Sequence, residues 1–422
     1  MTETHSTPHS LRSSPKNFVR TSLIAAAALL FSHVAMVRAQ PAANATGARQ
    51  VVSPEIGADN KITYRLYAPN AKQVGLTGDF IASNTRLTKD EASGVWSFTT
   101  ATAMPPGIYG YYFNLDGIRF ADPSNLFTFG GAHYLKSYVE VKGDGSEDWT
   151  LRDVPHGQLH EVWYKNPALG PRHVVIYTPP GYDPAAGKTY PAVYLYSGSG
   201  DNETYWSKIG RAHFIMDNLI AEGKAKPAIL VMPYGSTVVP SPADGQEDTT
   251  EGVYAVHAIE KDLIGSVIPA IEKNFRVGRE PKDRAIFGFS MGGYIAPTIG
   301  LNHPEIFGWV AGSSADYRGQ GAPNVNFKPL EAQLDLGKKN FKWIGLMVGT
   351  DPGESGHTNA SKGAADYLTG LGLKVEWAQP PGGSHTWTSW RGYFRDLMAN
   401  KFFAENPYAT PKVGTPLAAG KP

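Results

Sequence analysis

The chain has 422 residues, of which 18% are charged, and its formal net charge is +1. This length allows two or three domains. Without a basic excess to neutralise phosphates, the composition argues against partners such as nucleic acid or an anionic membrane surface. The chain has no cysteine, which excludes disulfides, thiolate zinc sites and a cysteine nucleophile.

Residues 1–39 have the pattern of a signal peptide. Basic residues precede an apolar stretch over 23–37, and Val37-Arg38-Ala39 places small or medium residues where a signal peptidase reads. The apolar stretch is short for a full membrane span. We therefore expect cleavage after Ala39 and export to the periplasm or the extracellular space, with no membrane contact afterwards. An uncleaved N-terminal anchor is the alternative.

Residues 40–49 are rich in Ala, Pro and Asn and are predicted to be a linker. From 50 to 142, short runs with alternating apolar residues, such as 62–67 and 109–115, are separated by turn residues at short intervals. This pattern is typical of an all-β, immunoglobulin-like sandwich.

Residues 143–406 have a different pattern, in which short apolar strands alternate with helical stretches. The alternation predicts a mostly parallel sheet covered by helices on both faces, with the first strands able to pair as an antiparallel edge. Residues 407–422 are rich in Pro, Gly, Ala and Lys and are predicted to be a disordered tail. The expected strands are 173–178, 192–196, 228–232, 285–287, 308–311, 343–348 and 375–378, and the expected helices are 207–222, 256–275, 291–301, 358–371 and 388–404.

The sequence Gly288-Phe289-Ser290-Met291-Gly292 fits the pattern G-x-S-x-G between a predicted strand and a predicted helix. Strand, sharp turn and helix are the context of a nucleophile elbow, in which the serine hydroxyl projects from the sheet. Glycine is needed on both sides because a Cβ atom there would collide where strand and helix converge. Ser290 is therefore the candidate nucleophile.

A serine hydroxyl needs a base to take its proton, and in α/β hydrolases the order along the chain is Ser, Asp or Glu, then His. His385 lies in a glycine-rich loop after the last predicted strand and is the expected base. The acid should follow the strand over 343–348. Asp351 is the first choice and Glu354 the alternative, because either could accept a hydrogen bond from the imidazole.

Two backbone N–H groups should stabilise the oxyanion. Met291, directly after the nucleophile, supplies one, and Gly198 or Ser199 in the Gly/Ser loop after an early strand supplies the other. Aromatic side chains are expected in loops beside the active edge: Trp206, Tyr254 and Trp387 are candidates for substrate binding. The chemistry requires no metal and no organic cofactor.

With these residues in place, the chain resembles the esterase-D/feruloyl-esterase group of α/β hydrolases, carbohydrate esterase family 1. Its first domain is similar to a family-48 carbohydrate-binding module. The resemblance extends over roughly residues 50–405. The motifs that carry it are 64–71 and 107–111 in the first domain, 154–157 and 177–182 at the entry to the second, and 217–224, 288–293 and 383–387 in its core.

Two positions depart from the family pattern. Ser197-Gly198 stands where the family usually has His-Gly, and Pro352 occupies the usual position of the acid. The resemblance implies a serine esterase that removes acyl groups from plant polysaccharide, with a feruloyl (hydroxycinnamoyl) group of arabinoxylan as first choice. Acetyl groups of xylan and siderophore lactones of the enterobactin type are alternatives. Substrates would be small esters or acylated oligosaccharides, with a polysaccharide contact through the sandwich. The alternative of a different class is a non-catalytic carbohydrate-binding protein on a hydrolase scaffold.

Overall fold

The computed structural model describes residues 51–130, 135–145, 147–236, 256–317 and 327–414. Residues 50–422 form one compact unit. The expected signal peptide and linker and the candidate Tyr254 lie outside the described residues. Every helix within the described ranges is too short or too polar to cross a bilayer.

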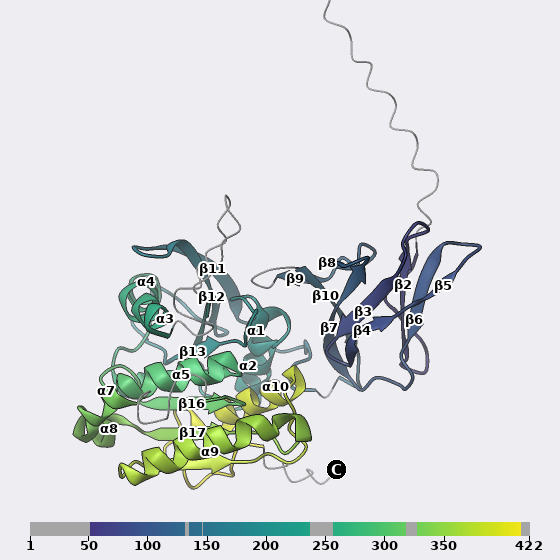
Figure 1. The fold of residues 1–422 in the computed structure, drawn as a ribbon. Helices are drawn as coiled ribbons and strands as arrows, with labels where there is room; N and C mark the ends of the chain where they lie inside the picture. The colour runs from purple at the N-terminus through teal and green to yellow at the C-terminus, as the bar shows by residue number, and fades with distance from the viewer. Residues whose placement is uncertain (1–50, 131–134, 146, 237–255, 318–326, 415–422) are drawn as a thin grey trace, which may run out of the picture. The chain divides into compact units, whose positions relative to one another are not determined.

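The N-terminal part is a β-sandwich, as predicted (Figure 1). One antiparallel sheet has the order β1(Glu55–Ile56), β2(Ile62–Tyr67), β6(Val95–Thr99), β5(Thr88–Asp90). The other has the order β4(Ile81–Arg86), β3(Val74–Gly78), β7(Gly107–Leu115), β10(Leu135–Val141), β9(Thr128–Gly130), and β8(Ile118–Phe120) pairs with β7. Alternate residues of the strands point inward and form a common core that includes Tyr64, Tyr111 and Phe113.

The second part is built on one sheet, which has an antiparallel edge followed by parallel strands. Its order is β11(Gln158–Asn166), β12(Gly170–Thr178), β14(Ile229–Pro233), β13(Ala192–Tyr196), β15(Arg284–Phe289), β16(Trp309–Ser313), β17(Trp343–Met347), β18(Val375–Ala378). The parallel strands read as nearly continuous apolar runs because both of their faces are buried. Adjacent strand residues such as Ile286 and Phe287 accordingly belong to different cores.

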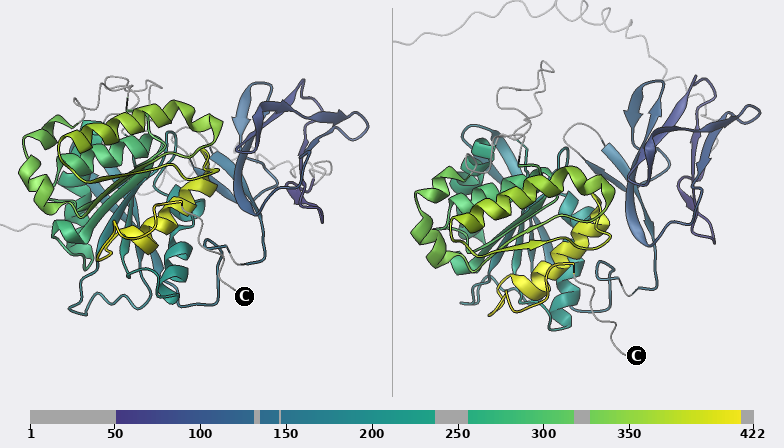
Figure 2. Two further views of the ribbon diagram at one scale, coloured as in Figure 1. Left: turned by 90° about the horizontal axis from the view of Figure 1, so that it is seen from below. Right: turned by 60° about the horizontal axis from the view of Figure 1, so that its bottom comes forward.

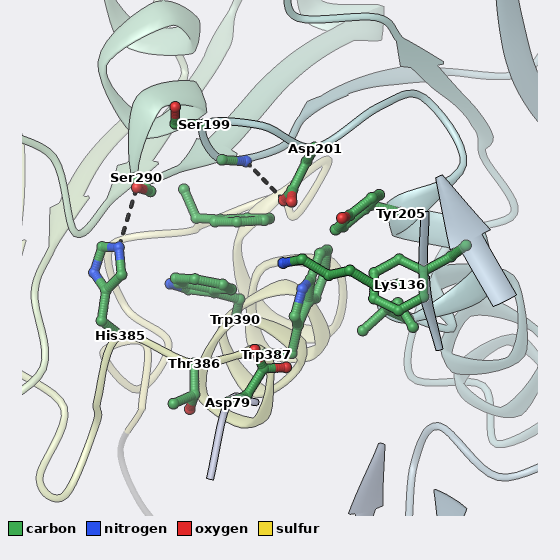
Figure 3. A pocket seen from close by; sticks show the side chains of 14 residues that line it. Asp79, Lys136, Ser199, Asp201, Tyr205, Ser290, His385, Thr386, Trp387 and Trp390 are labelled. Atoms are coloured by element: carbon green, nitrogen blue, oxygen red, sulfur yellow. Dashed lines mark hydrogen bonds between the residues drawn. The ribbon is translucent and has the colours of Figure 1, made fainter. Parts of the chain in front are cut away.

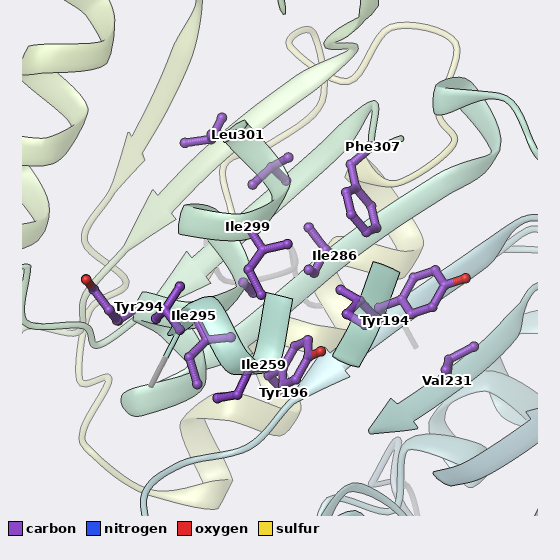
Figure 4. Close-up of a cluster of buried hydrophobic side chains, with 14 of the residues drawn as sticks. Tyr194, Tyr196, Val231, Ile259, Ile286, Tyr294, Ile295, Ile299, Leu301 and Phe307 are labelled. Carbon is purple, nitrogen blue, oxygen red and sulfur yellow. The ribbon is translucent and has the colours of Figure 1, made fainter. Parts of the chain in front are cut away.

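Helices cover both faces of this sheet, as predicted (Figure 2). On one face lie α3(Val256–Asp262), a π-helical turn, α4(Ile268–Asn274), α5(Met291–Asn302), α7(Lys328–Glu331), α8(Leu334–Asn340) and α9(Ser355–Gly370). On the other lie α1(Tyr205–Lys208), α2(Ala212–Ala221) and α10(Trp387–Asp396), the last continued by a π-helical turn to Lys401. Figure 4 shows the first of these cores, where Ile295 and Ile299 of α5 pack over Ile286 and Tyr194.

Two features differ from the sequence-based prediction. Strand β11, whose burial alternates as expected for a sheet edge, was not predicted, nor were the short helices α7 and α8. The predicted disordered tail is wrong for residues 407–414. There, Val413 is buried, and the carbonyl of Pro407 accepts a hydrogen bond from the buried Nζ of Lys401 at 3.0 Å. A buried ammonium needs such acceptors, which holds this segment in place.

The strand order reverses at β13, which pairs with β14 on one side and with β15 on the other. The loops that leave β13 and β15 at their carboxyl ends therefore diverge, and the space between them is the usual ligand position in an open α/β sheet. Ser197 begins the first loop, and Ser290 follows β15 directly.

We predict that Gly288→Ala destabilises the fold, because a Cβ there would lie 2.1 Å from the carbonyl oxygen of Gly292. The two backbones would have to separate, at a cost of about 2 kcal/mol or more. Gly363→Ala is the control, since Gly363 is exposed in α9 with nothing near its Cβ position. It should raise stability by about 0.5–1 kcal/mol. Urea unfolding measures both, and equal effects of the two substitutions would contradict the account.

Candidate active site

Ser290 occupies a strained turn between β15 and α5. Its φ is 55° and its ψ is −122°, a conformation that L residues rarely adopt. Its N–H donates to the carbonyl of Ser313 at 2.9 Å, which ties the turn to the neighbouring strand. A Cβ at Gly292 would meet the carbonyls of Tyr196 and Ser197 at 2.6 Å. The G-x-S-x-G pattern thus forms the elbow that the sequence predicted.

His385 lies opposite this serine, although the two are far apart in the chain. The distance from its Nε2 to Oγ of Ser290 is 3.0 Å (Figure 3). The loop that carries His385 packs closely on the loop after β17, because a Cβ at Gly349 would lie 2.0 Å from the carbonyl of Gly383. That carbonyl also accepts a hydrogen bond from the N–H of Asp351 at 2.9 Å. The pair has the geometry of a nucleophile and its base.

Glu354, rather than Asp351, is the carboxylate that faces His385. The Oε2 atom of Glu354 lies 3.4 Å from Nδ1 of His385. Its Oε1 accepts a hydrogen bond from the hydroxyl of Ser314 at 2.7 Å, and the side chain is fully buried. Asp351 is exposed, and its Oδ1 accepts from the N–H of Gly353 at 2.8 Å. The first choice of acid is therefore corrected to the alternative: Asp351 begins a 3₁₀ turn that carries Glu354 inward.

The environment of Glu354 keeps it ionised. Burial by itself would raise its pKa, but the close approach of His357 and the hydrogen bonds from His385 and Ser314 outweigh burial and lower the pKa to about 2. A carboxylate that is charged at all working pH values can orient the imidazole and stabilise its protonated form.

The imidazole of His385 is held between two rings. His357 of α9 stacks on it with ring centroids 4.8 Å apart, and Trp390 of α10 meets it edge-on at 5.1 Å. Nδ1 of His357 also lies 3.1 Å from Oε2 of Glu354. Glu354, His357 and His385 could together ligate a metal ion, since their ligand atoms lie within 4.8 Å of one another. Glu354 and His385 already form the hydrogen-bonded chain to Ser290.

The Gly/Ser loop after β13 lies beside the nucleophile, as expected for an oxyanion loop. A Cβ at Gly198 would be 3.4 Å from Cβ of Ser290. However, the N–H of Gly198 donates to Oδ2 of Asp201 at 3.2 Å, so its role as an oxyanion donor is not supported. Ser199 lines the same pocket, and Met291 begins α5. These two backbone N–H groups remain the candidates.

A pocket of about 240 Å³ opens beside Ser290 and His385 (Figure 3). Trp387 lines it, as predicted, together with Phe289 and Trp390. Trp206 does not fit its expected role: it is fully buried and packs edge-on against Phe289 and Trp387, behind the pocket wall. Helix α1 directs the side chain of Trp206 toward the sheet. Burial of this large apolar ring in the core is favourable, because it removes the ring from water.

Several residues at the site were not identified from the sequence. Ser314 could have been found, because it follows the carboxyl end of β16 at the same edge as Ser290. His357 directly precedes the helix predicted over 358–371, and Asp201 directly follows the Gly/Ser loop. Asp79 and Lys136 also line the pocket, and both belong to the sandwich. The sequence pattern of one domain does not indicate which of its residues contact another domain.

The sheet order and the elbow define an α/β-hydrolase fold, and Ser290, His385 and Glu354 have the order and the geometry of a serine triad. The chain matches the family model Esterase over residues 169–400, and it belongs to that family. Residues 50–125 match carbohydrate-binding module 48, the isoamylase N-terminal domain.

Curated relatives include an endo-1,4-beta-xylanase/feruloyl esterase from Xylanibacter ruminicola. It is 33% identical over 359 residues, which are 83% of this chain and 46% of that protein. Protein YbbA of Bacillus subtilis is 31% identical over 152 residues, 35% of this chain and 58% of that protein. The chain thus spans about half the length of these relatives.

Solved structures with a similar fold include a mutant feruloyl esterase module from Clostridium thermocellum complexed with sinapinate. Its TM-score is 0.50 at 20% identity, covering 65% of this chain and 97% of that one. The enterobactin esterase of Shigella flexneri has a TM-score of 0.54 at 19% identity, covering 80% of this chain and 92% of that one. At these identities the likeness shows the fold.

We predict that Glu354→Gln lowers kcat/KM for a simple ester by roughly 10²–10⁴-fold, because the imidazole loses its charged partner. Asp351→Asn is the matched control. It should change kcat/KM less than threefold, because Asp351 is an exposed loop carboxylate that does not contact the imidazole. Steady-state kinetics with a chromogenic ester compares them. A larger loss in the Asp351 variant would restore the first choice of acid.

The lowered pKa of Glu354 also predicts a pH-dependent stability. The pKa falls from 4.5 to about 2 on folding, so the ionised group stabilises the fold above about pH 4.5 and this contribution disappears as the pH falls toward 2. The shift corresponds to about 3 kcal/mol. The difference in unfolding free energy between the wild type and Glu354→Gln should therefore shrink over that window. A difference that is constant from pH 7 to pH 2 would contradict the assignment.

Proposed function

We propose that the protein is an exported serine carboxylic-ester hydrolase that removes acyl groups from plant polysaccharide, with feruloyl esters of arabinoxylan as its first substrates. The observation that carries the proposal is the chain of contacts from Ser290 through His385 to the buried Glu354. Membership of the Esterase family supports ester hydrolysis. The Xylanibacter ruminicola relative, an endo-1,4-beta-xylanase/feruloyl esterase, supports the feruloyl group and the xylan.

The reaction follows from the roles of these groups. His385 takes the proton of the Ser290 hydroxyl, whose oxygen attacks the ester carbonyl. The N–H groups of Met291 and Ser199 stabilise the tetrahedral oxyanion, and the alcohol leaves with the proton from His385. Water then cleaves the acyl-enzyme by the same steps, with Glu354 holding the imidazole throughout.

The shape of the site favours an aromatic acyl group over an acetyl group. Trp387 and Trp390 line the pocket, so a flat ring can lie along them, whereas an acetyl group would leave most of that apolar surface uncovered. The module-48 match over residues 50–125 supports a polysaccharide as the alcohol. The fold likeness to the enterobactin esterase keeps a siderophore lactone as a second candidate.

We predict that the wild type cleaves methyl ferulate in preference to p-nitrophenyl acetate, acetylated xylan and enterobactin. Ser290→Ala should reduce the methyl ferulate rate by about 10⁴-fold or more, since the nucleophile is lost while the pocket remains. Equal rates for the two proteins would favour the non-catalytic binding protein. Preference for acetylated xylan or enterobactin would replace the proposed acyl group.

A further inference from the structure

The active-site pocket has a second, charged region that the triad does not use. Asp79 and Lys136, from the sandwich, and Asp201, from the loop after β13, line the pocket together with its aromatic walls. In Figure 3 the amine of Lys136 extends into the pocket between Asp201 and Asp79, on the side away from Ser290. Two carboxyl groups and one ammonium group therefore lie within a single recess.

The sandwich residues are held by regular structure. Asp79 follows β3, and its Oδ2 accepts a hydrogen bond from the N–H of Gly110 in β7 at 3.0 Å. Lys136 is in β10. This strand pairs with β7 on the side opposite β3. Groups placed on paired strands keep a fixed position, as a recognition site requires.

The sandwich packs directly on the hydrolase part at this point. The ring of Phe129 in β9 meets that of Tyr205 in α1 edge-on, with centroids 4.8 Å apart. Phe129 and Ile108 belong to the same apolar core as the helices on that face of the hydrolase sheet. Nearby, Nη2 of Arg211 contacts Oε2 of Glu140 at 3.0 Å. These contacts present Asp79 and Lys136 to the pocket.

The charges of the recess interact with one another. Burial raises the pKa of Asp201, and the ammonium of Lys136 opposes this shift. The negative charge of Asp79 adds to the rise at Asp201, whereas the N–H of Gly198 counters it. The recess therefore offers an ammonium donor and carboxyl oxygens as acceptors, and it carries no excess of positive charge for an anionic ligand.

We propose that Lys136 and Asp79 read the oxygen substituents of an aromatic acyl group, so that the sandwich is part of the enzyme's acyl specificity. This inference rests on the proposed function. A ring lying along Trp387 and Trp390, which line the pocket beside Ser290, would point its far end, with its phenolic hydroxyl, toward the charged recess. A phenol both donates and accepts hydrogen bonds, which matches a carboxylate beside an ammonium. A ring without the hydroxyl would not form these hydrogen bonds, which weakens its transition-state binding relative to a phenol.

The test compares methyl p-coumarate, which has the phenolic hydroxyl, with methyl cinnamate, which lacks it. We expect the wild type to favour methyl p-coumarate by about tenfold or more in kcat/KM, since hydrogen bonds to charged groups contribute this much. Lys136→Met should remove most of that preference and leave the methyl cinnamate value within about threefold. Asp79→Asn, whose amide oxygen can keep the bond to Gly110, should lower the preference in the same direction.

Lys72→Met is the matched control, because Lys72 is an exposed sandwich lysine outside the pocket lining, and it should keep the wild-type preference. Thermal unfolding checks that each variant is folded. Unchanged preference in both Lys136→Met and Asp79→Asn would overturn the inference. So would variants that lose activity on a feruloylated arabinoxylan oligosaccharide but not on the methyl esters, which would place the sugar in the recess. If the wild type cleaves neither methyl ester but cleaves acetylated xylan, the proposed acyl group itself fails.

Discussion

The arrangement of the active edge depends on one buried carboxylate. Glu354 is fully buried, and its two oxygens contact Ser314, His357 and His385. Without these partners a charged group could not remain in such a position. The same contacts fix the imidazole toward Ser290, so the electrostatic requirement of a buried charge and the positioning of the base are met by one set of hydrogen bonds.

Backbone contacts set the distances that those hydrogen bonds need. The loop after β17 and the loop after β18 touch at Gly349 and Gly383, and the elbow touches the end of β13 at Gly292. Each contact excludes even a single methyl group. Loops from strands that are far apart in sequence are thereby brought to one rim of the sheet, which is where parallel strands of this fold class present functional groups.

Much of this could be predicted from the sequence. The strand pattern, the G-x-S-x-G elbow and His385 in a glycine-rich loop are local signals, and the structure confirms them. The choice between Asp351 and Glu354 could not be settled in the same way, because both lie in one short loop and a 3₁₀ turn decides which of them points inward.

Local sequence patterns also could not predict the residues of one domain that line a pocket of the other. The sequence of β10 shows only the alternation of an ordinary strand, and nothing in it marks Lys136. Its place in the pocket follows from the packing of Phe129 on Tyr205. Trp206 shows the opposite error, since an aromatic residue near the active edge proved to be core. Exposure and packing partners, rather than residue type, separate the two cases.

The geometry assigns the hydroxyl of Ser290 as a nucleophile activated by His385. Labelling the intact protein with a fluorophosphonate, followed by peptide mass spectrometry, tests it directly. We predict one covalent adduct on Ser290, formed much more slowly in His385→Ala. An unlabelled Ser290, or the same labelling rate without the imidazole, would contradict it.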